Sequence, residues 1–224
     1  MTPPGHGLLG VPDAGAFLAR LTRLDPAAVV RLRPAPDAGE PRTVLWGRLP
    51  WSVLVTRTVR GGAPGDATVG ASELLSVLTS GGAGLPLRRD AEWRWPLPPG
   101  AGRLVETVAA AELARIAEAA AGTLRTATAA AGRRVGERML RDALLDHVAI
   151  VATPATAAGT PAAAPVEVPQ RLVQAVVRMG FLGPAADLGG ETAQIRLAGR
   201  WVALCGPFGT AWLPPINRFV IRPV

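Results

Sequence analysis

Residues 68–78 read TVGASELLSVL, a valine followed by a short segment with the apolar spacing of a helix. The glycines after Ser80 end that segment. The same arrangement occurs four times, with a valine at the entry of each helical segment: Val11, Val69, Val108 and Val168. We therefore expect a helix-then-strands unit that repeats up to four times along the chain. One copy is shortened, and another carries an inserted helix at 135–147.

Alternation of apolar and polar residues predicts strands around these helices. The predicted strands cover residues 28–33, 43–49, 52–60, 87–97, 193–197, 200–205, 210–213 and 219–222. The predicted helices cover residues 14–24, 69–78, 109–131, 135–147 and 169–179. Helices and antiparallel strands come in separate runs with short connections, which indicates the α+β class. We expect an antiparallel sheet with repeated helix-then-strands units and a helical middle segment.

Composition and pattern divide the chain into four predicted parts. Residues 1–103 form an N-terminal α+β domain, and residues 104–150 form a helical segment. Residues 151–166 are rich in Ala, Thr and Pro, which is typical of a linker. Residues 167–224 form a C-terminal unit of one helix and a β-hairpin.

The segment Thr68–Leu78 resembles the short strand and helix that open a half-domain in DNA sliding clamps. The preceding ribbon Val44–Val59, with the long loop after it, is similar to the earlier strands of that half-domain. The resemblance implies a ring whose inner helices ride on duplex phosphates. It also implies outer sheets that carry pockets for partner proteins.

The composition excludes several enzyme classes. All 24 basic residues are arginine, so neither a P-loop lysine nor a Schiff-base lysine is present. A single cysteine, Cys205, excludes an intrachain disulfide and a multi-cysteine metal site. The first residues lack the pattern of a signal peptide, and prolines interrupt the longest uncharged run, residues 148–166. We expect a cytoplasmic protein without membrane insertion.

The formal net charge of +7 is unevenly distributed. The excess of arginine over acidic residues lies in residues 1–103 and 151–224, whereas residues 104–150 are neutral. This excess permits nucleic acid or an acidic protein as the partner and requires neither. It leaves the oligomeric state open.

Two clusters could carry catalysis or bind a metal. Cys205 could pair with His147 or His6, and Asp142, Asp146 and His147 could form a metal or general-base site. The alternatives are an inert thiol in an apolar strand and an exposed, ion-paired helix face on which Arg138 pairs with Asp142. His6 lies in a Gly- and Pro-rich terminus that we expect to be mobile. We favour these alternatives, and so predict no catalytic residue, no metal ligand and no cofactor.

Arginines interleaved with tryptophans form the predicted binding site, because guanidinium and indole faces suit phosphates, bases and protein hot spots. The site comprises Arg48, Trp51, Arg88, Arg89, Trp93, Arg94 and Trp95. On a strand, Trp93 and Trp95 would share one face opposite Arg94, which also fits two core tryptophans beside a solvated charge. The predicted function is a non-enzymatic binding or scaffold module that docks an anionic macromolecule or acidic protein. A sliding-clamp-like ring and an enzyme of unknown class are the alternatives.

Overall fold

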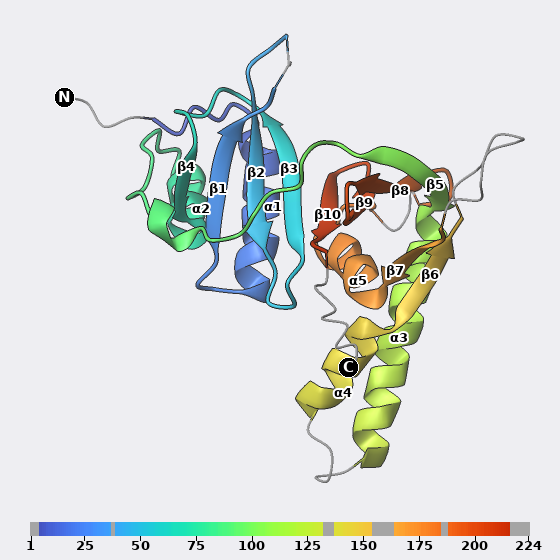
Figure 1. Ribbon diagram of the computed structural model, residues 1–224. Coiled ribbons are helices and arrows are strands. Elements are labelled where there is room, and N and C mark those ends of the chain that lie inside the picture. Colours follow the sequence, from blue (N-terminus) through green and yellow to red (C-terminus); the bar gives the residue numbers. More distant parts are fainter. Residues whose placement is uncertain (1–4, 37–38, 132–136, 154–163, 185–187, 216–224) are drawn as a thin grey trace, which may run out of the picture.

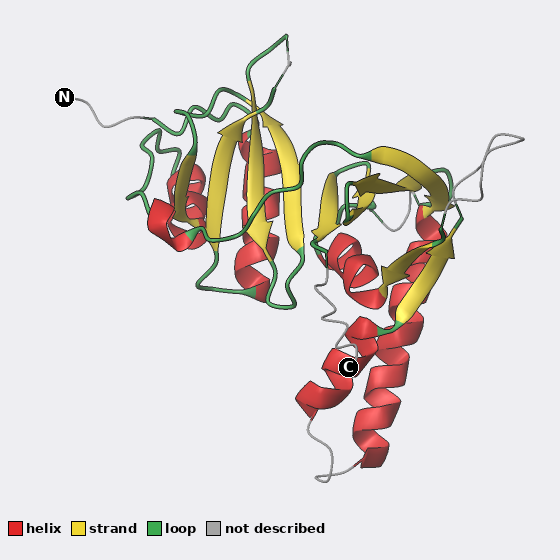
Figure 2. Ribbon diagram, in the orientation of Figure 1, coloured by secondary structure: helices red, strands yellow, loops and turns green. Residues whose placement is uncertain are grey.

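The computed structural model describes residues 5–36, 39–131, 137–153, 164–184 and 188–215. The helices are α1 (Val11–Leu24), α2 (Ala71–Thr79), α3 (Ala110–Ala131), α4 (Glu137–Asp146) and α5 (Gln170–Arg178), with a short 3-10 turn η1 (Asp90–Glu92). The strands are β1 (Val29–Pro34), β2 (Arg42–Arg48), β3 (Leu54–Arg60), β4 (Ala67–Gly70), β5 (Arg103–Ala109), β6 (Val148–Ala152), β7 (Val166–Pro169), β8 (Thr192–Ala198), β9 (Trp201–Gly206) and β10 (Gly209–Leu213). The α+β prediction is confirmed (Figure 2).

Eight strands form one antiparallel sheet in the order β4-β1-β2-β3-β10-β9-β8-β5. The order is symmetric about the β3–β10 junction, because each half has three consecutive strands followed outward by the strand that enters a helix. The halves join through three pairs: Leu54 with Trp212, Val55 with Ala211 and Thr56 with Thr210. A second sheet contains only β6 and β7.

The predicted repeat is visible in this arrangement. α1 precedes β1–β3, β4 leads into α2, β5 leads into α3, and β7 leads into α5 before β8–β10. The α2 copy is the shortened one, because no strand follows it before β5. The α3 copy carries α4 as the inserted helix. Figure 1 shows α3 and α4 extending away from the sheet.

The helices cover one face of the sheet, called here the helix face. α1 lies behind β1–β3 in Figure 1, α2 packs beside it next to β4, and α5 packs on β9 and β10. This face is built from fully buried aliphatic side chains, including Leu32, Leu45, Val55, Ile195 and Leu204. The rings of Phe17 in α1 and Phe181 after α5 stack at 6.4 Å between centroids, which joins the two halves in one core.

The opposite, outer face of the sheet is crossed by residues 88–102, called here the strap. Figure 1 shows it passing in front of β1, β2 and β3 on its way to β5. The prediction of a strand at 87–97 is wrong. Pro96, Pro98 and Pro99 have no N–H to donate to a sheet, and pairing with β4 is limited to the bridge between Val69 and Arg88 and one hydrogen bond from Arg89 to Thr68.

Other predicted elements agree with the structure to within a few residues. The hairpin of β8 and β9 turns at Gly199, and β6 and β7 pair on either side of the predicted linker. The central linker residues 154–163 and the predicted strand 219–222 lie outside the described residues. No helix in the part of the chain that the structure describes is long and apolar enough to span a membrane.

Candidate docking face

The strand register determines which arginines lie on the outer face. Arg31, Trp46, Thr56 and Thr210 are consecutive partners across β1, β2, β3 and β10, so their side chains share that face. By alternation and pairing, the same face carries these strand arginines: Arg31, Arg33, Arg42, Arg48, Arg60 and Arg196. The one acidic residue in the eight strands is Glu106 of β5. Asp66 pairs with Arg31 and Arg33, and Glu40 lies 4.0 Å from Arg60, so the outer face carries a positive excess that these acidic residues reduce but do not cancel.

Tryptophans hold the strap onto this face. Trp93 and Leu97 of the strap pack on a cluster of sheet residues: Trp46, Leu54, Ala198, Trp201, Ala203 and Trp212. The indole N–H of Trp93 donates to the carbonyl of Trp95 at 2.9 Å, which fixes the strap between them. Arg196 donates to the carbonyls of Ala101 and Gly102 at the far end of the strap.

Arg48 and Trp95 form the closest cation–π contact, with the guanidinium carbon 3.7 Å from the ring centroid. The Nη2 of Arg48 also donates to the Ser52 hydroxyl, while its buried Nε has no hydrogen-bond partner among the residues that the structure describes. Burial lowers the pKa of the Arg48 guanidinium, partly opposed by the charge of Asp25. These two predicted site residues therefore stabilise the strap on the sheet.

The positive charges of the three strap arginines differ in whether an acidic side chain pairs with them. Arg88 pairs with Asp90 at 2.7 Å, and Arg89 makes a bidentate pair with Glu92 at 2.6 and 2.7 Å. Arg94 is exposed and has no ion pair or hydrogen bond among the described residues. Of the strap cations, Arg94 is thus the one free to meet a partner.

Trp51 lies apart from the other predicted site residues. Its indole N–H donates to the Arg171 carbonyl at 3.2 Å, and Arg171 donates back to the Trp51 carbonyl at 3.1 Å. Arg178 lies over its ring at 5.6 Å. The turn that presents Trp51 contains Ser52 at φ 65°, a conformation that L residues rarely adopt. Trp51 joins the β2–β3 turn to α5.

Two adjoining cavities lie near the β3–β10 junction, one on the outer face and one in the fork between the two strands. A cavity of about 510 Å³ lies between the strap prolines Pro98 and Pro99 and a floor that includes Trp46 and Trp212. A second cavity, of about 420 Å³, is lined by Arg42, Arg57, Phe208 and Asp13, with threonines between them. Both cavities share three threonines: Thr56, Thr58 and Thr210. Together the cavities form a groove with an apolar end and a cationic end.

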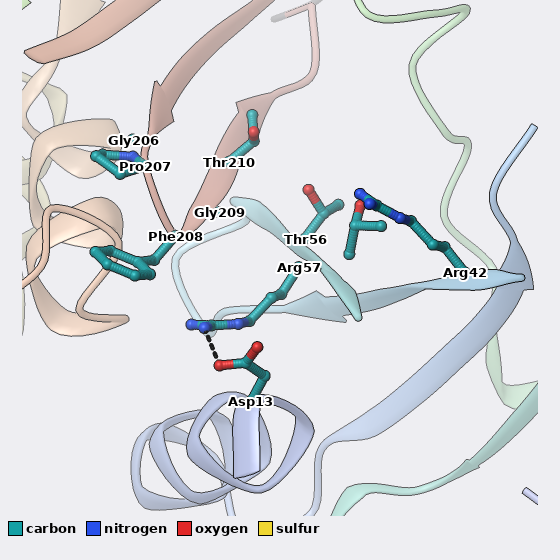
Figure 3. A pocket seen from close by; sticks show the side chains of 10 residues that line it. Asp13, Arg42, Thr56, Arg57, Gly206, Pro207, Phe208, Gly209 and Thr210 are labelled. Carbon is teal, nitrogen blue, oxygen red and sulfur yellow. Dashed lines mark hydrogen bonds and ion pairs between the residues drawn. The ribbon is translucent and has the colours of Figure 1, made fainter. Parts of the chain in front are cut away.

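The cationic end is a fork in the sheet. β3 pairs with β10 only as far as Thr56, whereas its pairing with β2 continues to Arg60. Figure 3 shows Arg57 turned toward α1, where it bonds Asp13 at 2.5 Å, and Arg42 on the other side of the cavity near Thr56. A Cβ at Gly209 would lie 2.5 Å from the Phe181 ring, so only glycine allows this approach.

The helices are electrostatically different from the outer face. α1, α2, α3 and α5 carry six arginines and four acidic residues: Arg20, Arg23, Arg115, Arg125, Arg171 and Arg178 against Asp13, Glu73, Glu112 and Glu118. Several of these charges are internally paired. Arg115 bonds Glu112, Arg171 bonds Asp146, and Asp13 bonds Arg57. The helix side is nearly neutral.

The alternative catalytic clusters are not assembled as reaction centres. Asp142 pairs with Arg138 at 3.9 Å, as expected for an exposed helix face, and Asp146 bonds Arg171. Burial raises the pKa of the Cys205 thiol, against weaker opposing effects of Thr210 and Arg196. Within the described ranges, no group of three or more His, Cys, Asp or Glu side chains is placed to hold a metal ion.

The expectation of a mobile His6 is wrong. The side chain is buried, Nδ1 accepts the Leu8 N–H at 3.0 Å, and Nε2 lies 3.0 Å from the Gly82 carbonyl. Because Nδ1 accepts, Nε2 carries the proton in this arrangement. His6 ties the N-terminal segment to the turn after α2.

Two family patterns match consecutive parts of the chain. The pattern of a domain of unknown function, DUF8185, matches residues 97–217, more than half of the chain. The chain belongs to this family. A second domain of unknown function, DUF8010, matches residues 10–95. No curated protein matches the chain in sequence.

Solved structures with a similar fold are DNA sliding clamps. The clamp of Pseudomonas aeruginosa, solved with ligand, is 14% identical at a TM-score of 0.52 and covers 95% of this chain. The beta subunit from the DNA polymerase of Streptococcus pyogenes is 12% identical at 0.53 over 96% of this chain and 67% of its own. The Helicobacter pylori clamp bound to a DNA ligase peptide is 10% identical at 0.53 over 94% of this chain and 66% of its own. The chain spans 65% of the length of the Pseudomonas clamp. The predicted resemblance to clamps is thus confirmed for the fold.

Sequence reasoning missed the groove. Arg42, Thr56 and Thr210 come together only through the β3–β10 pairing, which joins residues more than 150 positions apart. The run Thr56-Arg57-Thr58 was a possible signal, because three consecutive polar residues interrupt the apolar alternation of the strand.

Proposed function

We propose that this chain is a non-enzymatic binding module that docks an acidic segment of a protein partner on the outer face of its sheet. The observation that carries the proposal is the distribution of strand charges. Arginines occupy the outer face of the sheet, the strands contribute Glu106 as their one acidic residue, and the groove with its tryptophan floor opens on the same face. Positive charge around an aromatic-lined groove favours an anionic, partly apolar ligand.

The predicted site residues enter this proposal in two roles. Arg94 would contact the partner directly. Arg48, Trp93 and Trp95 would hold the strap that forms one wall of the groove. The Helicobacter pylori clamp, which shares the fold, was solved with a DNA ligase peptide bound, and this supports protein segments as a ligand class.

The test compares two pairs of charge reversals in the full chain. Arg42→Glu with Arg94→Glu changes the outer face, and Arg23→Glu with Arg125→Glu changes exposed positions on α1 and α3. Fluorescence anisotropy measures binding of a labelled polyglutamate peptide and of a short DNA duplex as NaCl is raised. We expect salt-sensitive peptide binding that only the outer-face pair abolishes. Equal loss in both pairs would contradict the proposal.

A ring that encircles DNA is the second candidate, favoured by the clamp fold and by the uncovered edge of β5, where Leu104 is 49% exposed. It predicts steeply salt-dependent duplex binding that is lost in the Arg23→Glu, Arg125→Glu pair. It also predicts a solution mass that is a multiple of the chain mass. A chain that is monomeric in solution and does not bind duplex DNA would exclude the ring.

A further inference from the structure

The cationic end of the groove combines an uncompensated arginine with several hydroxyl groups. The Arg42 side chain is exposed and makes no ion pair or hydrogen bond with any described residue. Its direct partner across the β2–β3 ladder is Arg60, so two like charges face each other on the same side of the sheet. Like charges in directly opposed positions destabilise a sheet. A negative group bound beside Arg42 would relieve this repulsion.

The nearby acidic side chains provide little compensation. Glu40 lies 4.0 Å from Arg60, and both side chains are about 70% exposed, so solvent screens this contact. Asp13 bonds Arg57 at 2.5 Å on the helix side of the fork. Asp13 thus neutralises Arg57 and leaves the charge of Arg42 uncompensated. Arg57 is 12% exposed and lies 5.6 Å from the Phe208 ring centroid, so it is a fixed wall of the cavity.

Hydroxyl donors surround the space beside Arg42. Thr56 is buried, and its β10 partner Thr210 and the exposed Thr58 line the same cavity of about 420 Å³. Guanidinium N–H groups together with hydroxyls are the donors that an oxyanion requires. The cavity is large enough for a phosphate or a carboxylate group, and it continues into the apolar end of the groove.

We propose that Arg42, Thr56, Thr58 and Thr210 form an oxyanion site at the β3–β10 fork, which binds a phosphate or carboxylate group. This inference rests on the proposed function, because the group would belong to the docked segment. The rest of that segment would continue past the shared threonines toward Trp46 and Pro98. The site would bind one anionic group at a fixed position, whereas the remaining arginines of the outer face would attract negative charge without fixing its position.

Small anions test this site without any partner. Two-dimensional amide NMR spectra of the full chain are recorded during titration with inorganic phosphate and, separately, acetate, with NaCl adjusted to constant ionic strength. We expect saturable shifts at Thr56, Thr58 and Thr210. Saturation by phosphate alone identifies a phosphate group as the ligand, and saturation by both anions identifies a general carboxylate or phosphate site.

Three variants separate a built site from surface charge. Arg42→Gln should weaken the affinity roughly tenfold, since it removes charge-assisted hydrogen bonds. Thr58→Val should weaken it several-fold without a change of charge. Arg103→Gln is the matched control, because Arg103 is an exposed arginine at the start of β5, on the far edge of the sheet, with no ion pair or side-chain hydrogen bond among the described residues. This variant should leave the affinity unchanged. Linear, unsaturable shifts with both anions, or equal responses in Arg42→Gln and Arg103→Gln, would overturn the site. Polyglutamate binding that survives such a result would leave the docking proposal standing.

Discussion

The two faces of the eight-stranded sheet are made from alternate residues of the same strands, yet they differ in almost every physical respect. On the helix face, Val55 and Leu45 are fully buried, and the strand charge Arg57 is bonded to Asp13. On the outer face, Trp46 and Thr56 lie beside strand arginines under a proline-rich strap. The helix face therefore supplies the stability, and the proposed docking falls on the outer face.

Phe181→Ala should give the largest effect on the helix-face side of this comparison. The ring is fully buried and stacked on Phe17, so its removal should lower the free energy of unfolding by about 3–5 kcal/mol. Urea denaturation followed by circular dichroism measures this change. Phe208→Ala is the control, because that ring is 41% exposed, and its effect should stay within about 1 kcal/mol. Equal losses would contradict the assigned role of the buried Phe181 ring as a main source of stability.

Trp51→Phe tests whether Trp51 acts as a structural joint. The substitution keeps a ring beneath Arg178 but removes the indole N–H that donates to the Arg171 carbonyl. Loss of this hydrogen bond should lower the free energy of unfolding by about 1 kcal/mol. For Trp95, no hydrogen bond from the indole is present in the described structure, so Trp95→Phe should cost less. A larger loss in Trp95→Phe would contradict the assigned roles.

Trp95→Ala should loosen the strap while leaving the core intact. It removes the stacking partner of Arg48, an exposed cation–π contact of about 0.5–1 kcal/mol. Hydrogen exchange should become faster in residues 93–101, with unchanged rates in α1 and α5. Faster exchange in the helices as well would show that the strap is part of the core.

Asp66→Asn concerns the acid sensitivity of the outer face. The two hydrogen bonds from Arg31, at 2.6 and 2.7 Å, hold the pKa of the Asp66 carboxyl below its usual range. Its stabilising contribution is therefore complete above the pKa of the unfolded chain, about 3.9, and is lost as the pH falls through the lower folded value. The variant should have a lower Tm at pH 7 and a flatter decline of Tm on acidification. Parallel curves for the two proteins would contradict this account.

Local pattern predicted much of the fold. The alternation in 193–205 and the helix-forming residues of 109–131 predicted β8, β9 and α3 with bounds that differ from the structure by one or two residues. These segments form mainly from contacts close in sequence, which a local pattern records. The prediction of a strand at 87–97 was wrong. It relied on the Trp-Arg-Trp alternation, but residues 90–92 form a 3-10 turn and Pro96 has no N–H to donate to a ladder. The division into residues 1–103, 104–150, 151–166 and 167–224 stays a prediction.

The candidate site was less accessible to sequence reasoning. Arg48 and Trp95 were chosen for their residue types, but their mutual stacking depends on how the strap crosses β2. Trp51 is three residues from Arg48 and lies at the contact with α5, since the β2–β3 turn carries it there. The cationic fork follows from pairing of distant strands, which no local pattern encodes.

Hydrogen–deuterium exchange of the full chain, with and without the polyglutamate peptide, tests the central claim most directly. We predict slower exchange on binding in β2, in β3 and in strap residues 93–101, with no change in α1, α2 or α3. Protection that falls on these helices and leaves the strap unchanged would contradict the claim that the outer face is the docking surface.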